Sequence, residues 1–99
     1  MIKRLEKKSS LPKDCYVYKH STACSLSATT AQIVNNTNFD LPVYWVDVIE
    51  QRKLSNQIAK RYGVRHESPQ IIKIEQGQST AVFSHHQIAP TQLEQAIRF

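Results

Sequence analysis

The sequence predicts an α/β protein in which one mixed four-stranded sheet carries helices on both faces. Three observations support this fold class. Residues 43–49 form a nearly continuous apolar run, which is typical of a strand covered on both sides. Apolar residues recur at helical spacing after the strand-like segments, and residues 70–83 have a hairpin pattern. The order strand, helix, strand, helix, strand, strand, helix then favours a right-handed β-α-β unit followed by a hairpin and a closing helix.

The first half of the chain supplies the β-α-β unit. Residues 15–19 are rich in tyrosine and valine and predict the first strand. From Cys24 onward, side chains that can face a core recur at spacings of three and four and predict a helix, which ends before the polar loop at 35–38. The face of this helix consists of Leu26, Thr30, Ile33 and Val34. The apolar run at 43–49 is the second strand.

The second half predicts a helix, a hairpin and a last helix. The helix is marked by a stripe at four-residue spacing and a C-terminal glycine: Leu54, Ile58, Tyr62 and Gly63. Residues 70–74 and 79–83 flank a polar turn and predict the hairpin. The segment 91–94, Thr-Gln-Leu-Glu, has the form of a capping box and predicts the start of the last helix.

Length and charge predict one small domain with a basic tail. The 99 residues suit a single core, and we expect residues 1–14 to be the tail and residues 15–99 the domain. The net charge of +5 arises mainly from the first 13 residues, where five basic residues oppose one acidic residue. The rest of the chain has no basic stripe interleaved with aromatics, so we expect a solvated tail and no nucleic-acid partner.

The chain also lacks the patterns of a membrane or secreted protein. No apolar run approaches the roughly 20 residues that a membrane helix needs. The basic N-terminus is not followed by the hydrophobic segment of a signal peptide. Two cysteines in such a chain suggest the reducing cytosol, so we expect a cytoplasmic protein without a membrane partner.

A single cysteine, Cys24, follows the first predicted strand in the segment "YKHSTACSLS" (18–27). In open α/β sheets, chemistry gathers outside the carboxyl ends of the strands. A helix N-terminus would aim free N–H groups and the positive end of its dipole at Cys24, which favours the nucleophilic thiolate. The alternative is that Cys24 packs as a small hydrophobe while Ser21 or Thr22 caps the helix.

Ser27 stands where a second cysteine would complete a dithiol pair. A serine cannot form a disulfide, so an external thiol must resolve any mixed disulfide on Cys24. Ser27 either donates a hydrogen bond to the thiolate or is simply a small polar helix residue. The other cysteine, Cys15, begins the strand whose far end leads to Cys24, roughly 16 Å away. A disulfide tolerates a Cα separation of only about 7 Å, so we interpret Cys15 as structural.

Three segments resemble the YtxJ-type bacilliredoxins, which are monothiol redox proteins of the bacillithiol system in the thioredoxin-like superfamily. These are "YKHSTACSLS", "RKLSNQIAKRYGVRHESPQ" and "FSHHQI", and the resemblance covers about residues 15–95. Family members commonly place Thr-Cys-Pro at the site, whereas Ala23 and Ser25 flank Cys24 here. The resemblance implies a thioredoxin-like fold, with Pro69 at the position of the cis-proline.

The resemblance also implies an activity. Cys24 would attack a protein mixed disulfide, take the bacillithiol moiety and be regenerated by a second low-molecular-weight thiol. The partners would be S-bacillithiolated proteins and the small thiol, with bacillithiol or another such thiol as co-substrate and no bound cofactor. Ser68 and Pro69 would form an edge that pairs with an extended substrate segment. Two alternatives remain: a glutaredoxin-like monothiol enzyme that uses another small thiol, and a non-enzymatic module that binds a partner through the proline edge.

Three further residues are expected to support the thiolate: Thr22, Lys19 and His20. Lys19 and His20 end the first strand and could offer positive charge or proton transfer. Alternatively, His20 makes only a local hydrogen bond and Lys19 is solvated. His85 and His86 are neighbours on a predicted strand end and would point to opposite faces, which argues against a two-histidine metal site. We expect no metal.

Overall fold

The computed structural model describes residues 2–97, which form five strands, three α-helices and two short 3₁₀ helices. The strands are β1 (Ile2–Arg4), β2 (Cys15–His20), β3 (Val43–Asp47), β4 (Gln70–Glu75) and β5 (Gln78–Ser84). The helices are α1 (Leu26–Asn35), α2 (Arg52–Tyr62) and α3 (Pro90–Ile97), with 3₁₀ turns η1 (Lys8–Ser10) and η2 (His85–Gln87). Each predicted strand and helix has its counterpart in this set.

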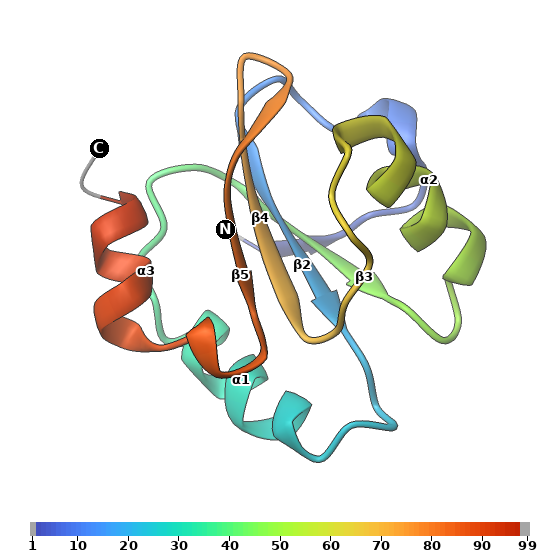
Figure 1. Ribbon diagram of the computed structural model, residues 1–99. Coiled ribbons are helices and arrows are strands. Elements are labelled where there is room, and N and C mark those ends of the chain that lie inside the picture. The colour runs from blue at the N-terminus through green and yellow to red at the C-terminus, as the bar shows by residue number, and fades with distance from the viewer. Residues whose placement is uncertain (1, 98–99) are drawn as a thin grey trace.

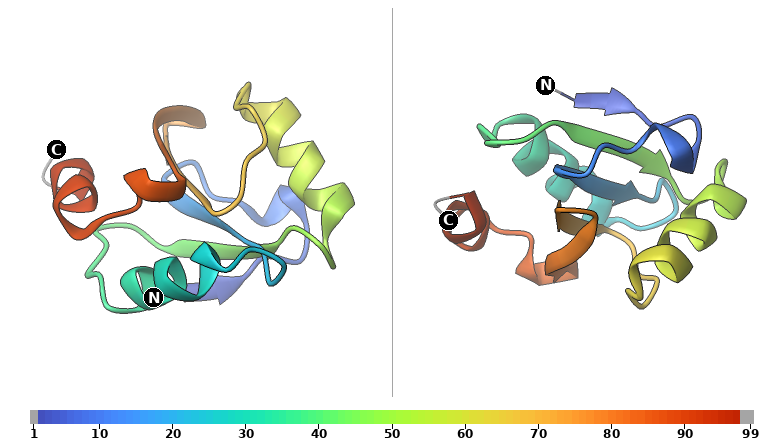
Figure 2. Two further views of the ribbon diagram at one scale, coloured as in Figure 1. Left: turned by 60° about the horizontal axis from the view of Figure 1, so that its bottom comes forward. Right: turned by 90° about the horizontal axis from the view of Figure 1, so that it is seen from above.

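All five strands belong to one mixed sheet with the order β1-β3-β2-β4-β5. β2 pairs with β3 in parallel and with β4 in antiparallel orientation. α1 and α3 cover one face of the sheet, whereas α2 covers the other (Figures 1 and 2). The predicted fold class is therefore confirmed, and β2 lies at the centre of the sheet.

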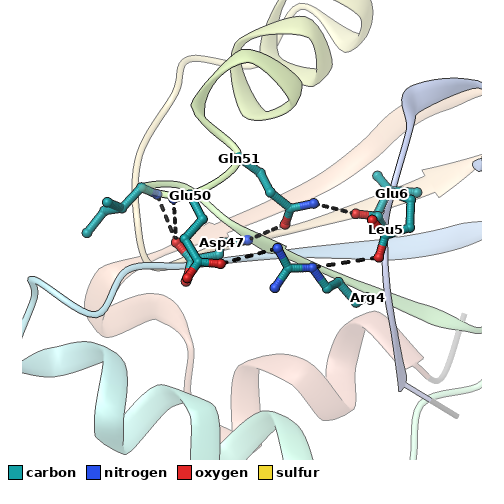
Figure 3. A network of polar contacts seen from close by, with 7 residues as sticks. Arg4, Leu5, Glu6, Asp47, Glu50 and Gln51 are labelled. Carbon is teal, nitrogen blue, oxygen red and sulfur yellow. Dashed lines mark hydrogen bonds and ion pairs between the residues drawn. The ribbon is translucent and has the colours of Figure 1, made fainter.

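The prediction of four strands was wrong by one, because β1 adds a strand at the edge. Ile2–Arg4 pairs in parallel with β3, and the following Leu5 is buried in the core. The Gln51 side chain donates to the Leu5 carbonyl at 2.6 Å, and Arg4 Nη2 contacts Glu50 Oε2 at 3.3 Å (Figure 3). The segment assigned to the basic tail thus holds a strand whose basic side chains lie at the surface.

Side chains along β2 alternate between two cores. Cys15 and Val17 pack on the α2 face of the sheet. Tyr16 and Tyr18 pack on the opposite face, against α1 and α3. The period of two in a strand then places Lys19 on the α2 face and His20 on the α1 face. The two polar residues that end β2 therefore serve different sides of the sheet.

Local sequence patterns predicted the turns correctly but not the start of the last helix. Gly63 ends α2 with a φ of 63° in the left-handed region, as a C-cap glycine should. Gln76 and Gly77 have φ values of 54° and 77°, as in the two-residue turns that close hairpins. The predicted capping box was wrong, because α3 begins at Pro90 and Thr91 already lies inside it. Proline is preorganised for the first helical position.

Candidate active site

Cys24 lies just beyond the carboxyl end of β2, in the turn that leads into α1. The first helical residue is Leu26, so Cys24 precedes the helix instead of standing in its first turn as expected. The chain has already begun to turn there: Cys24 N–H donates to Ser21 O at 3.4 Å, and Ser27 N–H donates to Cys24 O at 3.0 Å. The thiol is free and half-buried. This placement keeps Cys24 at the N-terminal end of α1.

Ser27 fastens the loop of Cys24 to the helix. Its side chain is buried, and its Oγ accepts a hydrogen bond from the Ser21 backbone N–H at 3.4 Å. The hydroxyl proton of Ser27 is then left for another acceptor. Cys24, Ser27, Thr22 and His20 line one cavity of about 300 Å³. The structure thus brings together four of the five residues expected at the thiolate.

His20 belongs to a hydrogen-bonded group below this cavity. The Tyr18 hydroxyl lies 3.1 Å from His20 Nδ1 and 3.0 Å from Thr30 Oγ1. Burial raises the pKa of Tyr18 against the opposing hydrogen bond with Thr30, and the nearby Cys24 adds to the rise. Burial lowers the pKa of His20 although Asp47 opposes the shift, so His20 is largely neutral at neutral pH. Sequence reasoning missed Tyr18, which the alternation along the first strand places on the same face as His20.

Lys19 is the expected site residue that lies elsewhere. Its side chain is fully buried on the α2 face, where Nζ donates to Ser55 O at 3.1 Å and to His66 Nδ1 at 3.2 Å. The interpretation of Lys19 as a solvated residue was therefore wrong. Burial lowers the pKa of Lys19 to about 8, which still leaves it mostly protonated at neutral pH. His66 was not predicted, because it contacts Lys19 across 47 positions of sequence.

Ser68 and Pro69 lie beside the end of β2. The Ser68–Pro69 peptide bond is cis, which confirms the prediction. Gln70 pairs with Lys19, so the proline stands next to the last residue of β2. The Pro69 carbonyl accepts from His85 N–H at 2.9 Å. Within residues 2–97, neither backbone group of Ser68 has a hydrogen-bond partner, so this edge is open. Contact between Cys24 Sγ and Pro69 stays a prediction.

Cys15 is placed and protonated as a structural thiol. It is fully buried in the α2-face core, and its Sγ donates to Pro12 O at 3.6 Å. Burial, reinforced by the charge of Asp14, raises the pKa of Cys15 to about 11. Because the thiolate is the reactive form, Cys15 should be inert at neutral pH.

We therefore expect iodoacetamide to alkylate Cys24 at least about ten-fold faster than Cys15 at neutral pH. The reason is that Cys15 is both inaccessible and held as a thiol, whereas Cys24 borders an open cavity. Peptide mapping by mass spectrometry over a time course measures both rates in one sample. In urea the two rates should converge, which serves as the control. Equal rates in the folded protein would contradict the placement of the two thiols.

The described residues offer neither a metal-binding group nor a membrane-spanning helix. Among residues 2–97, no cluster of three or more His, Cys, Asp or Glu side chains is arranged to hold a metal ion. His85 and His86 lie in η2, so the expected strand end is in fact a 3₁₀ turn. None of the helices in this part of the chain is long and apolar enough to cross a membrane.

Comparisons with known proteins agree with this geometry. Residues 2–93 match the sequence profile of the family described as monothiol bacilliredoxin BrxC. The chain belongs to the monothiol bacilliredoxin family. The match begins at residue 2 and so takes in β1, which lies ahead of the segments on which the sequence resemblance was based.

Solved structures show the same fold. A structure described as that of a proposed oxidoreductase with a thioredoxin fold is 30% identical, with a TM-score of 0.83, and covers 96% of this chain and 92% of its own. Malassezia sympodialis thioredoxin is 21% identical, with a TM-score of 0.72 and coverage of 99% and 89%. A mutant thioredoxin from Halobacterium salinarum NRC-1 is 17% identical, with the same TM-score and coverage of 98% and 88%. The fold is thioredoxin-like, and family and fold together identify a thiol oxidoreductase.

Proposed function

We propose that this protein removes bacillithiol from protein mixed disulfides by a monothiol mechanism at Cys24. The observation that carries the proposal is the unequal placement of the two cysteines. Cys24 borders a cavity at the open end of β2, whereas Cys15 is buried at the other end of the same strand. Ser27 occupies the position where a resolving cysteine would stand. A single reactive thiol without an internal partner suits transfer of a small thiol better than dithiol reduction.

The reaction consists of two thiol–disulfide exchanges. The Cys24 thiolate attacks the bacillithiol sulfur of the mixed disulfide, forming a Cys24–bacillithiol disulfide and releasing the protein thiolate. A second low-molecular-weight thiolate then attacks the bacillithiol sulfur of this intermediate. That step restores the Cys24 thiolate and releases a disulfide between bacillithiol and the second small thiol, so the oxidation passes from the protein to a small molecule.

Several neighbours are assigned supporting roles in this proposal. The Ser27 hydroxyl and the Thr22 side chain would donate to the thiolate, and this role is supported by the cavity that both residues share with Cys24. His20 is the candidate for proton transfer, since it is largely neutral and tied to Tyr18. Lys19 acts from the other face of the sheet and adds positive potential near the end of β2.

The open edge at Ser68 is the proposed docking strand for the substrate. Its unpaired backbone N–H and C=O can hydrogen-bond an extended segment that carries the modified cysteine, which is strand addition at an edge. The partners would be S-bacillithiolated proteins and the small thiol, and the compartment would be the reducing cytoplasm.

Mass spectrometry tests the mechanism directly. When the reduced protein is mixed with a bacillithiolated protein, we expect the bacillithiol mass on Cys24 and expect it to persist until free thiol is added. The Ser27→Cys variant is the matched comparison, because its internal disulfide should shorten the life of the adduct. An internal Cys15–Cys24 disulfide in the wild-type product would refute the monothiol mechanism.

The same experiment separates the alternatives. Transfer from a glutathionylated protein but not from a bacillithiolated one would favour a glutaredoxin-like enzyme with another small thiol. Absence of any adduct, together with binding of the modified protein, would favour the non-enzymatic module.

A further inference from the structure

A buried lysine lies beneath the open edge without a carboxylate partner. Lys19 is 0% exposed. None of the ion pairs within residues 2–97 includes it. Its hydrogen bonds go to a backbone carbonyl, Ser55 O, and to a neutral ring nitrogen, His66 Nδ1. A buried ammonium group that no anion compensates is costly to a fold. This cost suggests that the positive charge of Lys19 has a function.

Lys19 fixes the protonation of His66. An ammonium group can only donate hydrogen bonds, so Nδ1 of His66 must be the acceptor at 3.2 Å. The ring proton then resides on Nε2. Burial, Lys19 and Arg52 lower the pKa of His66 although the charge of Glu67 opposes the shift, so the ring is neutral at neutral pH. With Nδ1 turned toward the buried lysine, the Nε2–H edge belongs to the exposed side of the ring, where Lys19 polarises it as a donor.

His66 lines a cavity of about 460 Å³ between α2 and the Ser68 edge. Arg52 and Asn56 add a guanidinium group and an amide from α2, and none of the lining residues is a carboxylate. The acidic side chains that flank these segments, Asp47, Glu50 and Glu67, do not line the cavity, although the charge of Glu67 acts on His66. Glu50 contacts Arg4 at 3.3 Å (Figure 3), and Glu67 faces His85 at 3.9 Å. Among the described residues that line the cavity, Arg52 is thus the one with a full charge, and His66 and Asn56 add N–H donors beside it.

This cavity adjoins the cavity of the reactive thiol. Ser21 lines both cavities, and Ala23, which precedes Cys24 in the chain, lines the cavity of His66. Ile49 forms an apolar side and is 44% exposed. Its loop is held in place because Asp47 Oδ1 accepts the backbone N–H groups of Ile49 and Glu50 at 2.9 and 3.0 Å (Figure 3). A substrate attached near Cys24 can thus lay an apolar stem on Ile49 and reach the donors beyond it.

We propose that this cavity is a carboxylate-binding subsite for the disulfide substrate. Arg52 and the Nε2–H of His66 hold the carboxylate, and Lys19 is a positioning residue that fixes and polarises His66. The inference rests on the proposed exchange at Cys24 and adds a recognition element to it. The carboxylate comes either from the small-thiol half or from an acidic side chain of the protein half.

A neutral and an anionic disulfide together test the subsite. We would measure thiolation of Cys24 by bis(hydroxyethyl) disulfide, which is neutral, and by dithiodipropionate, which carries two carboxylates. The anionic-to-neutral rate ratio should fall about five-fold in Arg52→Gln, the size of a good partly exposed charge interaction. Lys53→Gln is the matched control, since it removes the same charge from the adjacent position of α2 outside this cavity. Its ratio should stay within about two-fold of wild type, because remote exposed charges are screened.

A second pair of substrates identifies the source of the carboxylate. Peptides capped with mercaptoethanol and carrying Asp or Asn beside the modified cysteine place the charge on the protein half. If the Asp peptide reacts faster than the Asn peptide and this preference depends on Arg52, the subsite binds the protein half. If only the preference for dithiodipropionate depends on Arg52, the subsite binds the small-thiol half. If neither preference depends on Arg52, the subsite is refuted, although thiolation of Cys24 by the neutral disulfide would still uphold the proposed function.

The role of Lys19 has a spectroscopic readout. In the unreactive Cys24→Ser protein, the nitrogen chemical shifts of His66 should report a ring protonated on Nε2. Titration with dithiodipropionate should shift Nε2, and the titration with bis(hydroxyethyl) disulfide should not. In the Lys19→Met variant of this protein, the ring should lose its single tautomer and the response to dithiodipropionate should weaken. A proton on Nδ1, or the same response in both proteins, would overturn the arrangement.

Discussion

Replacing Cys24 by serine is expected to lower the rate of bacillithiol transfer at least about a thousand-fold, to the level of the uncatalysed exchange. A serine hydroxyl stays protonated at neutral pH and attacks sulfur poorly, whereas exchange requires a thiolate. The substitution is nearly isosteric at a half-buried position, so the fold should survive. Single-turnover transfer, followed by mass spectrometry of both proteins, measures the loss.

The matched control is Cys15→Ala. This change removes the other thiol from the α2-face core and leaves the cavity of Cys24 untouched. We expect transfer within about two-fold of wild type, with a modest loss of stability of about 1 kcal/mol for the deleted sulfur. Transfer that survives in Cys24→Ser would show that Cys24 is not the nucleophile. Loss of transfer in a folded Cys15→Ala protein would contradict the assignment as well.

The sequence was sufficient for most of the fold because the signals are local. A continuous apolar run predicted β3, and a four-residue stripe with Gly63 at its end predicted α2 and its C-cap. β1 was missed because it has only three residues, of which Lys3 and Arg4 are exposed. What holds it is pairing with β3, about 40 positions away along the chain. No local sequence pattern predicts such a long-range pairing.

The same limit applies to the site. Cys24, Ser27 and the Ser68–Pro69 pair could be recognised within short segments. The environment of Lys19 could not be recognised in this way. It depends on Ser55 of α2 and His66 of the following loop, which lie far from Lys19 in the sequence. A lysine at the end of a strand is ordinarily solvated, and only the packing of α2 over β2 buries this one. The contact through which Lys19 acts on the cavity of His66 and Arg52 was therefore not predictable.

The burial of Lys19 leads to a second large effect, on stability. At neutral pH, Lys19→Met is expected to raise the free energy of unfolding by about 2 kcal/mol, because it replaces an uncompensated charge by an apolar side chain of similar length. The pKa of Lys19 falls from 10.5 to about 8 on folding. At about 1.4 kcal/mol per pKa unit this shift corresponds to about 3 kcal/mol. The expected gain is smaller, because methionine also loses the hydrogen bonds that Lys19 Nζ donates to Ser55 O and His66 Nδ1.

The sign of the pH dependence follows from proton binding. Between pH 8 and 10.5 the unfolded state holds more protons on Lys19 than the folded state does. The contribution of Lys19 to the stability of the wild type therefore rises with pH across this window. Below the window, the burial of the charged lysine destabilises the fold to its full extent. Cys15, Tyr16 and Tyr18, whose pKa values are raised by folding, act in the opposite direction. They are present in both proteins and cancel in the difference, and His66 is neutral throughout the window.

Urea unfolding of the wild type and Lys19→Met, followed by circular dichroism at several pH values from neutral upward, measures this difference. The advantage of the variant should shrink toward zero as the pH approaches 10.5, the ordinary lysine value. A difference that stays constant with pH, or a variant less stable at neutral pH, would mean that Lys19 carries no uncompensated charge. If the variant is more stable and also responds less to dithiodipropionate, then Lys19 lowers the stability of the fold and supports binding of the anionic disulfide. A positive charge beneath the substrate edge is then retained for binding, at the expense of about 2 kcal/mol of stability.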